Sequence, residues 1–270
     1  MRKRKTLLIL LVLFSMFIYG CAKEGKKVIS QNNSIQKENI ESSKDNIEVS
    51  EEIIDEKENE IVEEMKTIVI DPGHSSVGNK EKEPIAPNSS TKKTKDVLGA
   101  TGVATNIPEH ITTVKISNLL QEKLSEMGFN VIMTKTKVEE SLSNIERAQI
   151  GNENNADLVV RIHADSAGSQ EAKGASILVP PKNQYTNDIS DISKKYGETI
   201  IDIYTSELGI KNRGVIYRDD MTGFNWSKVP VVILEMGFLS NKEEDLFLSD
   251  TNNHEKIAST IANGIKACFE

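Results

Sequence analysis

Residues 67–74 read Thr-Ile-Val-Ile-Asp-Pro-Gly-His. The β-branched run 67–70 predicts a short buried strand, and the Asp-Pro-Gly that follows predicts a turn that ends it. His74 comes directly after that turn. In α/β sheets, binding sites form at the carboxyl ends of the strands. The stretch therefore predicts both a core strand and the edge of a functional site.

Outward from this stretch, apolar runs alternate with segments of helical spacing. The sequence predicts further strands at 129–133, 157–162, 175–179 and 229–234, and helices at 108–127, 143–155, 187–207 and 252–269. The acidic stretch 243–245 indicates the first turn of another helix. Residues 75–106 show little periodicity and are expected to form a long loop. The alternation predicts an α/β fold: a single domain with a mostly parallel twisted sheet covered by helices on both faces.

The first 20 residues are typical of a bacterial export signal. Four basic residues at 2–5 precede an apolar run at 7–19, which is short for a transmembrane helix. The run ends in Gly20-Cys21, which resembles a lipobox. We therefore expect a lipoprotein-type signal peptide over 1–20 and a lipid anchor on Cys21. The alternative is an uncleaved N-terminal anchor. Both place the rest of the chain outside the cytoplasm, at the outer face of the cytoplasmic membrane.

The segment 21–66 differs sharply in composition from the rest of the chain. Residues 22–66 hold 13 Asp/Glu and 7 Lys, and no proline or aromatic residue. Such a segment buries too little apolar surface to offset the entropy of ordering, so we expect a disordered charged linker. A partial helix over 47–65 is the alternative. The folded domain is then predicted to span 67–270.

Composition excludes several classes of protein. The formal net charge of −8 argues against a nucleic-acid-binding protein, which would present a basic face. Two cysteines, Cys21 and Cys268, exclude a disulfide-stapled scaffold, and Cys268 falls on the apolar stripe of the last predicted helix. The sequence contains no G-x-S-x-G elbow, Walker A loop or dinucleotide fingerprint.

Candidate site residues lie at the ends of three predicted strands. His74, His163 and Glu235 follow the first, third and last strands, and Glu109 lies at the start of the first helix. Two imidazoles and a carboxylate form a suitable catalytic zinc site, because three protein ligands leave a fourth position for water. A further carboxylate can transfer protons as general base and acid.

Three segments, in order, resemble the zinc-dependent N-acetylmuramoyl-L-alanine amidases of the type-3 group, which are bacterial cell-wall hydrolases. They are Ile-Val-Ile-Asp-Pro-Gly-His at 68–74, Ala-Asp-Leu-Val at 156–159 running into Ile-His-Ala at 162–164, and Glu-Met-Gly-Phe-Leu-Ser-Asn at 235–241. The resemblance covers 67–270. The long spacing from His74 to Glu109, with Thr101-Gly102-Val103 before Pro108-Glu109, is similar to a subgroup with an extended first loop. Ser75-Ser76 and Asp165 depart from the usual residues at their positions.

The resemblance implies a function for four residues. His74, Glu109 and His163 would bind Zn²⁺, and Glu235 would be the catalytic acid/base. The implied reaction is hydrolysis of the amide between N-acetylmuramic acid and L-alanine in peptidoglycan. Zinc would polarise the lactyl carbonyl for attack by water, and Glu235 would pass a proton to the departing amine.

Alternatives remain at the sequence level. His110, adjacent to Glu109, could be argued as the third ligand, although helix neighbours point about 100° apart. The whole domain could instead be a non-catalytic or partner-activated peptidoglycan-binding module, or a zinc peptidase of the stem peptide. Any activator protein is unknown.

Other polar residues have both structural and functional interpretations. Asp71 could accept a hydrogen bond from a ligand histidine or cap the turn, and Arg161 could bind a peptide carboxylate or form a structural ion pair. Trp226 could stack on a sugar or pack internally. We expect His254 at the surface. The lysines Lys92, Lys93 and Lys95 are interpreted as solvated charge.

Overall fold

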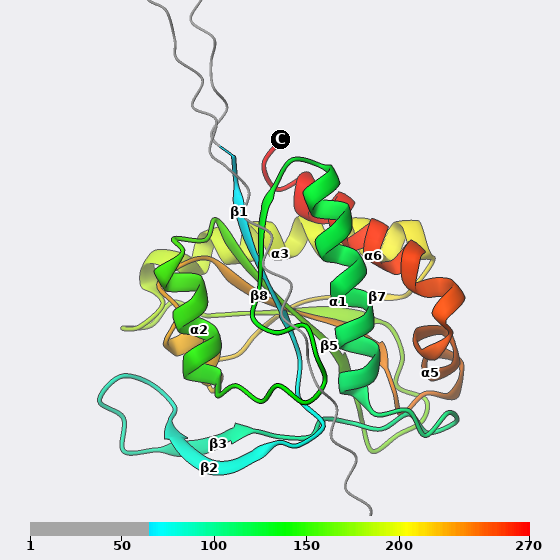
Figure 1. Cartoon of the computed structure of the whole chain (residues 1–270), viewed down its shortest axis with the longest axis horizontal. Helices are drawn as coiled ribbons and strands as arrows, with labels where there is room; N and C mark the ends of the chain where they lie inside the picture. The colour runs from blue at the N-terminus through cyan, green and yellow to red at the C-terminus, as the bar shows by residue number, and fades with distance from the viewer. Residues whose placement is uncertain (1–64) are drawn as a thin grey trace, which may run out of the picture. The chain divides into compact units, whose positions relative to one another are not determined.

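The computed structural model describes residues 65–270 (Figure 1). The predictions for the signal peptide, Cys21 and nearly all of the linker lie outside the described residues. The strands of the described part are β1 (Thr67–Pro72), β2 (Asn79–Pro84), β3 (Lys92–Asp96), β4 (Asn130–Met133), β5 (Leu158–Asp165), β6 (Ala175–Val179), β7 (Asn212–Tyr217) and β8 (Val231–Phe238). Its helices are α1 (Glu109–Glu126), α2 (Asn144–Glu153), α3 (Asn187–Leu208), α4 (Thr222–Asn225), α5 (Lys242–Ser249) and α6 (Thr251–Lys266).

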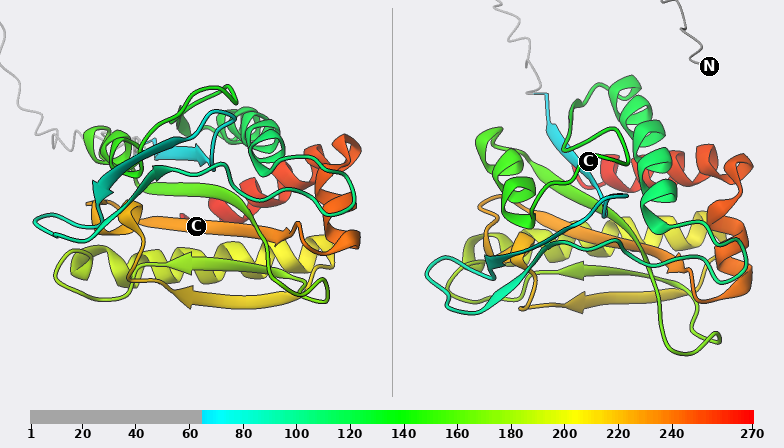
Figure 2. Two further views of the ribbon diagram at one scale, coloured as in Figure 1. Left: turned by 90° about the horizontal axis from the view of Figure 1, so that it is seen from below. Right: turned by 60° about the horizontal axis from the view of Figure 1, so that its bottom comes forward.

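Six strands form one twisted sheet in the order β4-β1-β5-β8-β6-β7. The four strands β4, β1, β5 and β8 are parallel to one another, β6 runs antiparallel to β8, and β7 is parallel to β6. Helices lie on both faces of this sheet (Figure 2). The predicted α/β class with a mostly parallel, covered sheet is confirmed.

Side chains alternate between two cores, one on each face of the sheet. Ile68 and Ile70 of β1 belong to the larger core, which α1, α3 and α6 cover. Val69 of the same strand belongs to the smaller core, which includes Phe224 of α4. α2 lies over this second face beside α4 (Figure 1). The second face is the one on which the candidate site is built.

The expected long loop at 75–106 is not structureless. It contains the antiparallel hairpin of β2 and β3, a separate two-stranded sheet. The hairpin was not predicted because its strands are rich in lysine and glutamate and contribute almost no apolar side chains to the core. Strand β7 was also not predicted, since its residues are half-buried or exposed at the edge of the sheet.

Two further predictions concerned the burial of single side chains, Cys268 and His254. Cys268 is buried, as predicted, and burial raises the pKa of its thiol to about 12. The surface position expected for His254 is wrong, because His254 is buried at the start of α6 with Nε2 2.8 Å from the carbonyl oxygen of Leu248. Within residues 65–270, no helix is both long and apolar enough to cross a membrane.

Candidate metal centre

The alternation of side chains on β5 and β8 brings two predicted site residues to one face. On β5, Val159 lies in the smaller core, and His163 lies four positions further on the same face. On β8, Ile233 lies in that core, and Glu235 follows two positions later. The register of the two strands pairs His163 with Glu235. Both side chains therefore reach the same edge of the sheet, at the carboxyl ends of neighbouring parallel strands.

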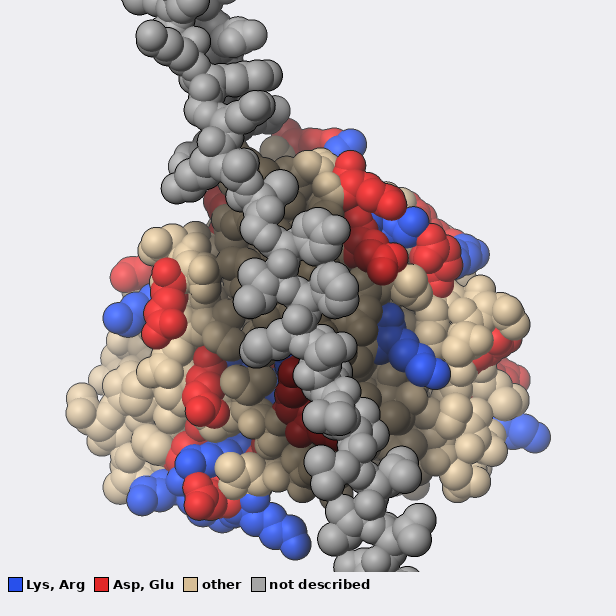
Figure 3. Space-filling view, in the orientation of Figure 1, with Lys and Arg blue, Asp and Glu red and all other residues tan. Residues whose placement is uncertain are grey.

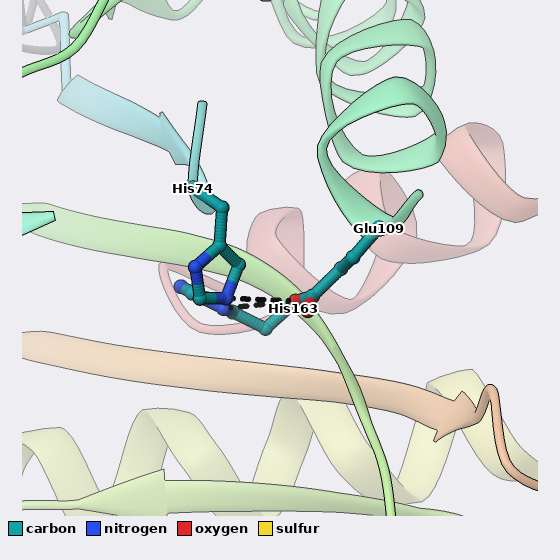
Figure 4. A group of neighbouring side chains, drawn as sticks. All are labelled: His74, Glu109 and His163. Atoms are coloured by element: carbon teal, nitrogen blue, oxygen red, sulfur yellow. Dashed lines mark hydrogen bonds and ion pairs between the residues drawn. The ribbon is translucent and has the colours of Figure 1, made fainter. Parts of the chain in front are cut away.

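Three of the predicted residues form a tight cluster. Nε2 of His74 lies 3.2 Å, and Nδ1 of His163 3.1 Å, from Oε1 of Glu109. One potential ligand atom from each residue falls within 4.8 Å of the others. The two rings meet edge to face with their centroids 4.8 Å apart. Figure 4 shows the three side chains converging from β5, from the turn after β1 and from the start of α1.

The turn after β1 orients His74 toward the cluster. His74 adopts a left-handed backbone conformation with φ of 60°, which is uncommon for a residue other than glycine. The backbone of this turn is held by Thr113, whose hydroxyl donates to the Gly73 carbonyl, and by Lys135, whose ammonium donates to the His74 carbonyl. A Cβ atom at Gly73 would lie 2.4 Å from Cε1 of His163, so only glycine lets the turn approach the second imidazole.

Glu109 is almost fully buried, but its carboxylate accepts hydrogen bonds from the protein. The backbone N–H of Ala164 donates to Oε1, and that of Ala100 donates to Oε2. Burial alone would raise the pKa of Glu109, but hydrogen bonds with His163 and His74 outweigh this effect and hold the pKa well below its usual range. The carboxylate is therefore ionised at neutral pH.

The contacts of His74 imply that a cation belongs in the cluster. Nδ1 of His74 lies 2.7 Å from the carbonyl oxygen of Val97, which can only accept, so Nδ1 carries a hydrogen. In a neutral ring, Nε2 would then direct a lone pair at the Glu109 carboxylate. A proton or a metal ion between the two atoms removes this repulsion. His163 adds a buried Nε2 without a hydrogen-bond partner.

This donor set suits a borderline metal ion such as zinc. Two imidazole nitrogens and one carboxylate oxygen are the ligand types of catalytic zinc sites. Tetrahedral zinc with bonds of about 2.0–2.1 Å separates its ligand atoms by roughly 3.3–3.4 Å, close to the contacts in this cluster. The residues present therefore fit the metal.

Glu235 completes the edge of the cluster. It lines one groove together with His74 and His163, and its Oε2 is buried without a partner. Burial raises the pKa of Glu235 well above its usual value, and the charges of Glu109 and Asp165 raise it further. These surroundings favour the protonated form of the carboxyl group.

Comparison with known proteins gives this site a context. The sequence profile of the family described as N-acetylmuramoyl-L-alanine amidase matches residues 68–267.

The chain belongs to the N-acetylmuramoyl-L-alanine amidase family.

Members of this family hydrolyse an amide bond of peptidoglycan, and the chain is an enzyme of this kind. Two relatives in sequence match most of the described domain. The uncharacterized protein YqiI of Bacillus subtilis is 28% identical over 207 residues, which cover 77% of this chain and 86% of YqiI. The probable cell wall amidase LytH of Staphylococcus aureus is 26% identical over 204 residues, which cover 76% of this chain. The match spans 58% of the length of LytH.

Solved structures of amidases share the fold. The apo form of the N-acetylmuramyl-L-alanine amidase Ami1 from Mycobacterium abscessus superposes with a TM-score of 0.68 at 24% identity, covering 76% of this chain and 99% of Ami1. The CwlD amidase from Clostridioides difficile, solved in complex with the GerS lipoprotein, has a TM-score of 0.61 at 26% identity. It covers 76% of this chain and 98% of CwlD.

Asp71 has neither of the roles predicted for it. Its carboxylate lies between two buried guanidinium groups, 2.6 Å from Nη1 of Arg147 and 2.6 Å from Nε of Arg161, and it also accepts from Thr134. The carboxylate therefore fixes β1 against α2 and β5 beside the candidate metal ligands. For Arg161, the structural ion pair is the observed arrangement, although its side chain also lines the groove.

The remaining alternatives are decided by contacts. His110 is not part of the cluster, because its Nδ1 faces the Leu98 carbonyl at 3.5 Å. Trp226 is half-buried and donates from Nε1 to the carbonyl of Pro84 in β2. The lysines predicted as solvated charge are partly engaged, since Lys93 pairs with Asp220 at 2.9 Å and Lys95 with Glu81 at 2.8 Å.

Sequence reasoning missed the residues that hold the site in place. Arg147, Thr113 and Lys135 contact the turn at 71–74 from α2, α1 and the segment after β4. No local pattern distinguishes such residues from ordinary surface or helix residues. Their function follows only from which elements the fold brings together.

Proposed function

We propose that this enzyme is a zinc-dependent amidase that cleaves the bond between N-acetylmuramic acid and L-alanine, with His74, Glu109 and His163 as the metal ligands and Glu235 as the acid/base. The observation that supports this most directly is the convergence of two imidazole nitrogens on one buried carboxylate oxygen, at 3.1 and 3.2 Å. The cluster opens into a groove of about 520 Å³, large enough for part of a muramoyl peptide.

The ligand residues bind and orient the ion through contacts that already exist. The Val97 carbonyl fixes the tautomer of His74, and two backbone N–H groups fix the carboxylate of Glu109. When bound, zinc would supply a Lewis acid that polarises the scissile carbonyl and lowers the pKa of water to about 7.

Glu235 supplies the proton transfers. Its position beside His163 on the next strand places the carboxylate at the edge of the ligand cluster, in the same groove. Glu235 takes a proton from the attacking water and delivers it to the nitrogen of the departing alanine. A positive charge at the cluster would counter the influence of Glu109 and lower the pKa of Glu235, which favours release of its proton.

The decisive experiment maps the bond that is cut. Purified protein is incubated with cell-wall peptidoglycan, with a chelator, and with the chelator followed by zinc, and the new termini are identified by mass spectrometry. We expect zinc-restored release of stem peptides that begin with free L-alanine.

Two other outcomes would each contradict the proposal. Another new amine would identify a peptidase that cuts within the stem peptide. Retention of peptidoglycan without any new terminus would indicate a binding module or an enzyme that needs an activator protein. The metal content measured in the same samples separates a zinc-free preparation from an inactive zinc enzyme.

We also infer that the enzyme acts outside the cytoplasm, held by a lipid on Cys21. The support is the sequence alone: basic residues, a short apolar run and Gly20-Cys21. The 45 residues of the charged segment 22–66 would let the enzyme reach the wall. Mass spectrometry of the mature N-terminus should find a lipid-modified Cys21, and Cys21→Ala should release the protein from the membrane fraction. An unmodified chain that begins at Met1 would favour the uncleaved anchor.

A further inference from the structure

The groove that holds the candidate metal centre is lined mainly by basic side chains on its other wall. Besides His74, His163 and Glu235, it is bordered by Lys82, Lys92 and Lys93 of the β2–β3 hairpin and by Arg161 of β5. Glu235 is the single carboxylate among the residues that line it in the described part of the chain. Figure 3 shows lysine and arginine side chains gathered over the hairpin, with a few acidic ones between them.

This basic wall contrasts with the rest of the molecule. The domain from 67 to 270 carries 22 Lys/Arg and 28 Asp/Glu, so it is acidic overall. A cleft lined by one sign of charge concentrates the field inside it and attracts ligands of the opposite sign. An acidic domain with a basic groove is therefore suited to an anionic part of its substrate.

Two of the four cations are neutralised, and two are available. Lys93 is paired with Asp220, and Arg161 is paired with Asp71. Lys82 donates to the hydroxyl of Thr94 at 2.8 Å. Among residues 65–270, neither Lys82 nor Lys92 has a carboxylate partner. These two ammonium groups can bind an anion without first breaking an ion pair.

The hairpin presents these lysines from a fixed position. Both carboxylate oxygens of buried Glu83 accept backbone N–H groups at the start of α2, from Asn144 and Ile145. Trp226 donates to the Pro84 carbonyl, and Asn225 donates to the carbonyl of the next residue in the hairpin. A ligand site on such an anchored element loses less conformational entropy on binding than one on a free loop.

The chemistry of the substrate decides which anion this is. The glycan strand of peptidoglycan consists of neutral N-acetylated sugars, and the lactyl carboxyl of muramic acid is consumed in the scissile amide. The anionic groups of the substrate are therefore the carboxylates of the stem peptide. We propose that Lys82 and Lys92 bind a free carboxylate on the second residue of the stem peptide, so that the enzyme prefers stems whose second residue is glutamate over stems in which this group is amidated. This proposal rests on the proposed function, because it places the scissile amide at the His74–His163 cluster.

Binding to two matched ligands tests the proposal. They are N-acetylmuramoyl-L-alanyl-γ-D-glutamyl-L-lysine and its D-isoglutaminyl counterpart, which differ only in that the α-carboxylate of the second residue is replaced by an amide. Their dissociation constants are measured calorimetrically on zinc-loaded, full-length Glu235→Gln, at low and high salt. We expect the carboxylate ligand to bind about tenfold more tightly at low salt and this preference to shrink at high salt.

Lysine variants made in the Glu235→Gln protein test whether Lys82 and Lys92 cause the preference for the carboxylate ligand. Lys82→Gln/Lys92→Gln should abolish it, and Lys82→Arg/Lys92→Arg should retain it. Lys115→Gln/Lys256→Gln removes two exposed lysines of the helices α1 and α6, so it changes the net charge equally and should leave the preference intact. Circular dichroism confirms that each variant is folded.

Equal affinity for the two ligands, or a preference that survives Lys82→Gln/Lys92→Gln, would overturn the subsite. So would a failure of both ligands to bind. Turnover of the same compounds by the unmodified protein is a separate measurement. Without release of L-alanyl peptides, the proposed function fails even if the binding preference is found.

Discussion

Glu109 and Glu235 are both buried carboxyl groups at one site, but their surroundings give them opposite protonation behaviour. Glu109 accepts two backbone N–H groups and faces two imidazoles, so it stays ionised. Glu235 has one oxygen without a partner and lies near negative charge, so it holds a proton more readily. A pair of carboxyl groups whose pKa values are pushed apart is typical of a ligand and an acid/base in one active site.

Replacing Glu235 by glutamine should separate catalysis from metal binding. We expect kcat to fall by about 10²–10⁴, because the amide cannot exchange protons, while zinc content and thermal stability stay near those of the unmodified protein. Turnover is measured by release of L-alanyl peptides, and zinc by elemental analysis.

Glu243→Gln is the matched control for this substitution, since Glu243 is an exposed carboxylate in the first turn of α5. It should leave turnover unchanged. Activity of Glu235→Gln within a factor of two of the unmodified protein would remove Glu235 as the acid/base.

At the scale of elements, the proposed metal ligands lie on strands and helices that a buried ionic network joins. Asp71 at the end of β1 binds Arg147 of α2 and Arg161 of β5. Burial would raise the pKa of Asp71, but the two guanidinium groups outweigh it and hold the pKa well below its usual range. The turn that carries His74 begins immediately after this carboxylate, so the network also supports the site.

Asp71→Asn should destabilise the fold by about 3–5 kcal/mol, because two buried guanidinium groups lose their carboxylate. The pKa of Asp71 is lower in the folded state than in the unfolded state. Its stabilisation is therefore complete above the unfolded pKa of about 3.9 and is lost as the pH falls toward the folded pKa.

Urea unfolding from pH 7 to pH 3 measures this effect. The difference in the free energy of unfolding between the two proteins should be constant above pH 5 and should decrease below about pH 4. A difference that does not change with pH would show that the Asp71 carboxylate keeps the same proton affinity on folding.

The β2–β3 hairpin is a second element whose attachment can be tested. Glu83 joins β2 to the N-terminus of α2, where a negative charge is favoured by the helix dipole and by the free N–H groups. Glu83→Gln should cost about 1–2 kcal/mol and increase amide hydrogen exchange across 79–96. Glu81→Gln, at an exposed position on the same strand, should change neither quantity. Unchanged exchange in Glu83→Gln would mean that the other contacts of the hairpin, among them those of Trp226, Asn225 and Lys93, hold it without Glu83.

At the scale of the whole molecule, metal binding should appear as stability. A ligand that binds only the folded state stabilises it by about 2.7 kcal/mol at 100 times its dissociation constant. For a domain of this size this corresponds to a rise in Tm of roughly 5–10 °C. We expect zinc to produce this rise in chelator-treated protein and magnesium to produce none, since magnesium prefers oxygen ligands. His163→Ala should lose the response, and an equal response in that variant would place the ion elsewhere.

The sheet and its helices could be predicted from the sequence because their side chains alternate or recur with a clear period. The hairpin could not, because a strand such as Lys92–Asp96 carries no apolar face and is defined by its pairing with β2. His254 was misplaced for a similar reason, since its burial comes from α5 packing beside the start of α6 and not from its own neighbours in sequence. At the site, His74, His163 and Glu235 could be predicted because each is a metal-binding or acid/base residue type and each follows a predicted strand. The inclusion of Glu109 relied on family resemblance, because the distance along the chain from His74 does not reveal that the two residues meet.

The hairpin leaves the domain at Asn79 and rejoins it at Asp96, and these two residues face each other across its base. Because the two ends of the hairpin lie side by side, it can be lengthened, shortened or exchanged while the six-stranded sheet keeps its register. The wall of the groove that would select the stem peptide is therefore a modular insert, and the proposed metal ligands lie outside it. A lineage whose cell wall changes its amidation pattern could follow that change by altering this insert, with the hydrolytic centre inherited intact.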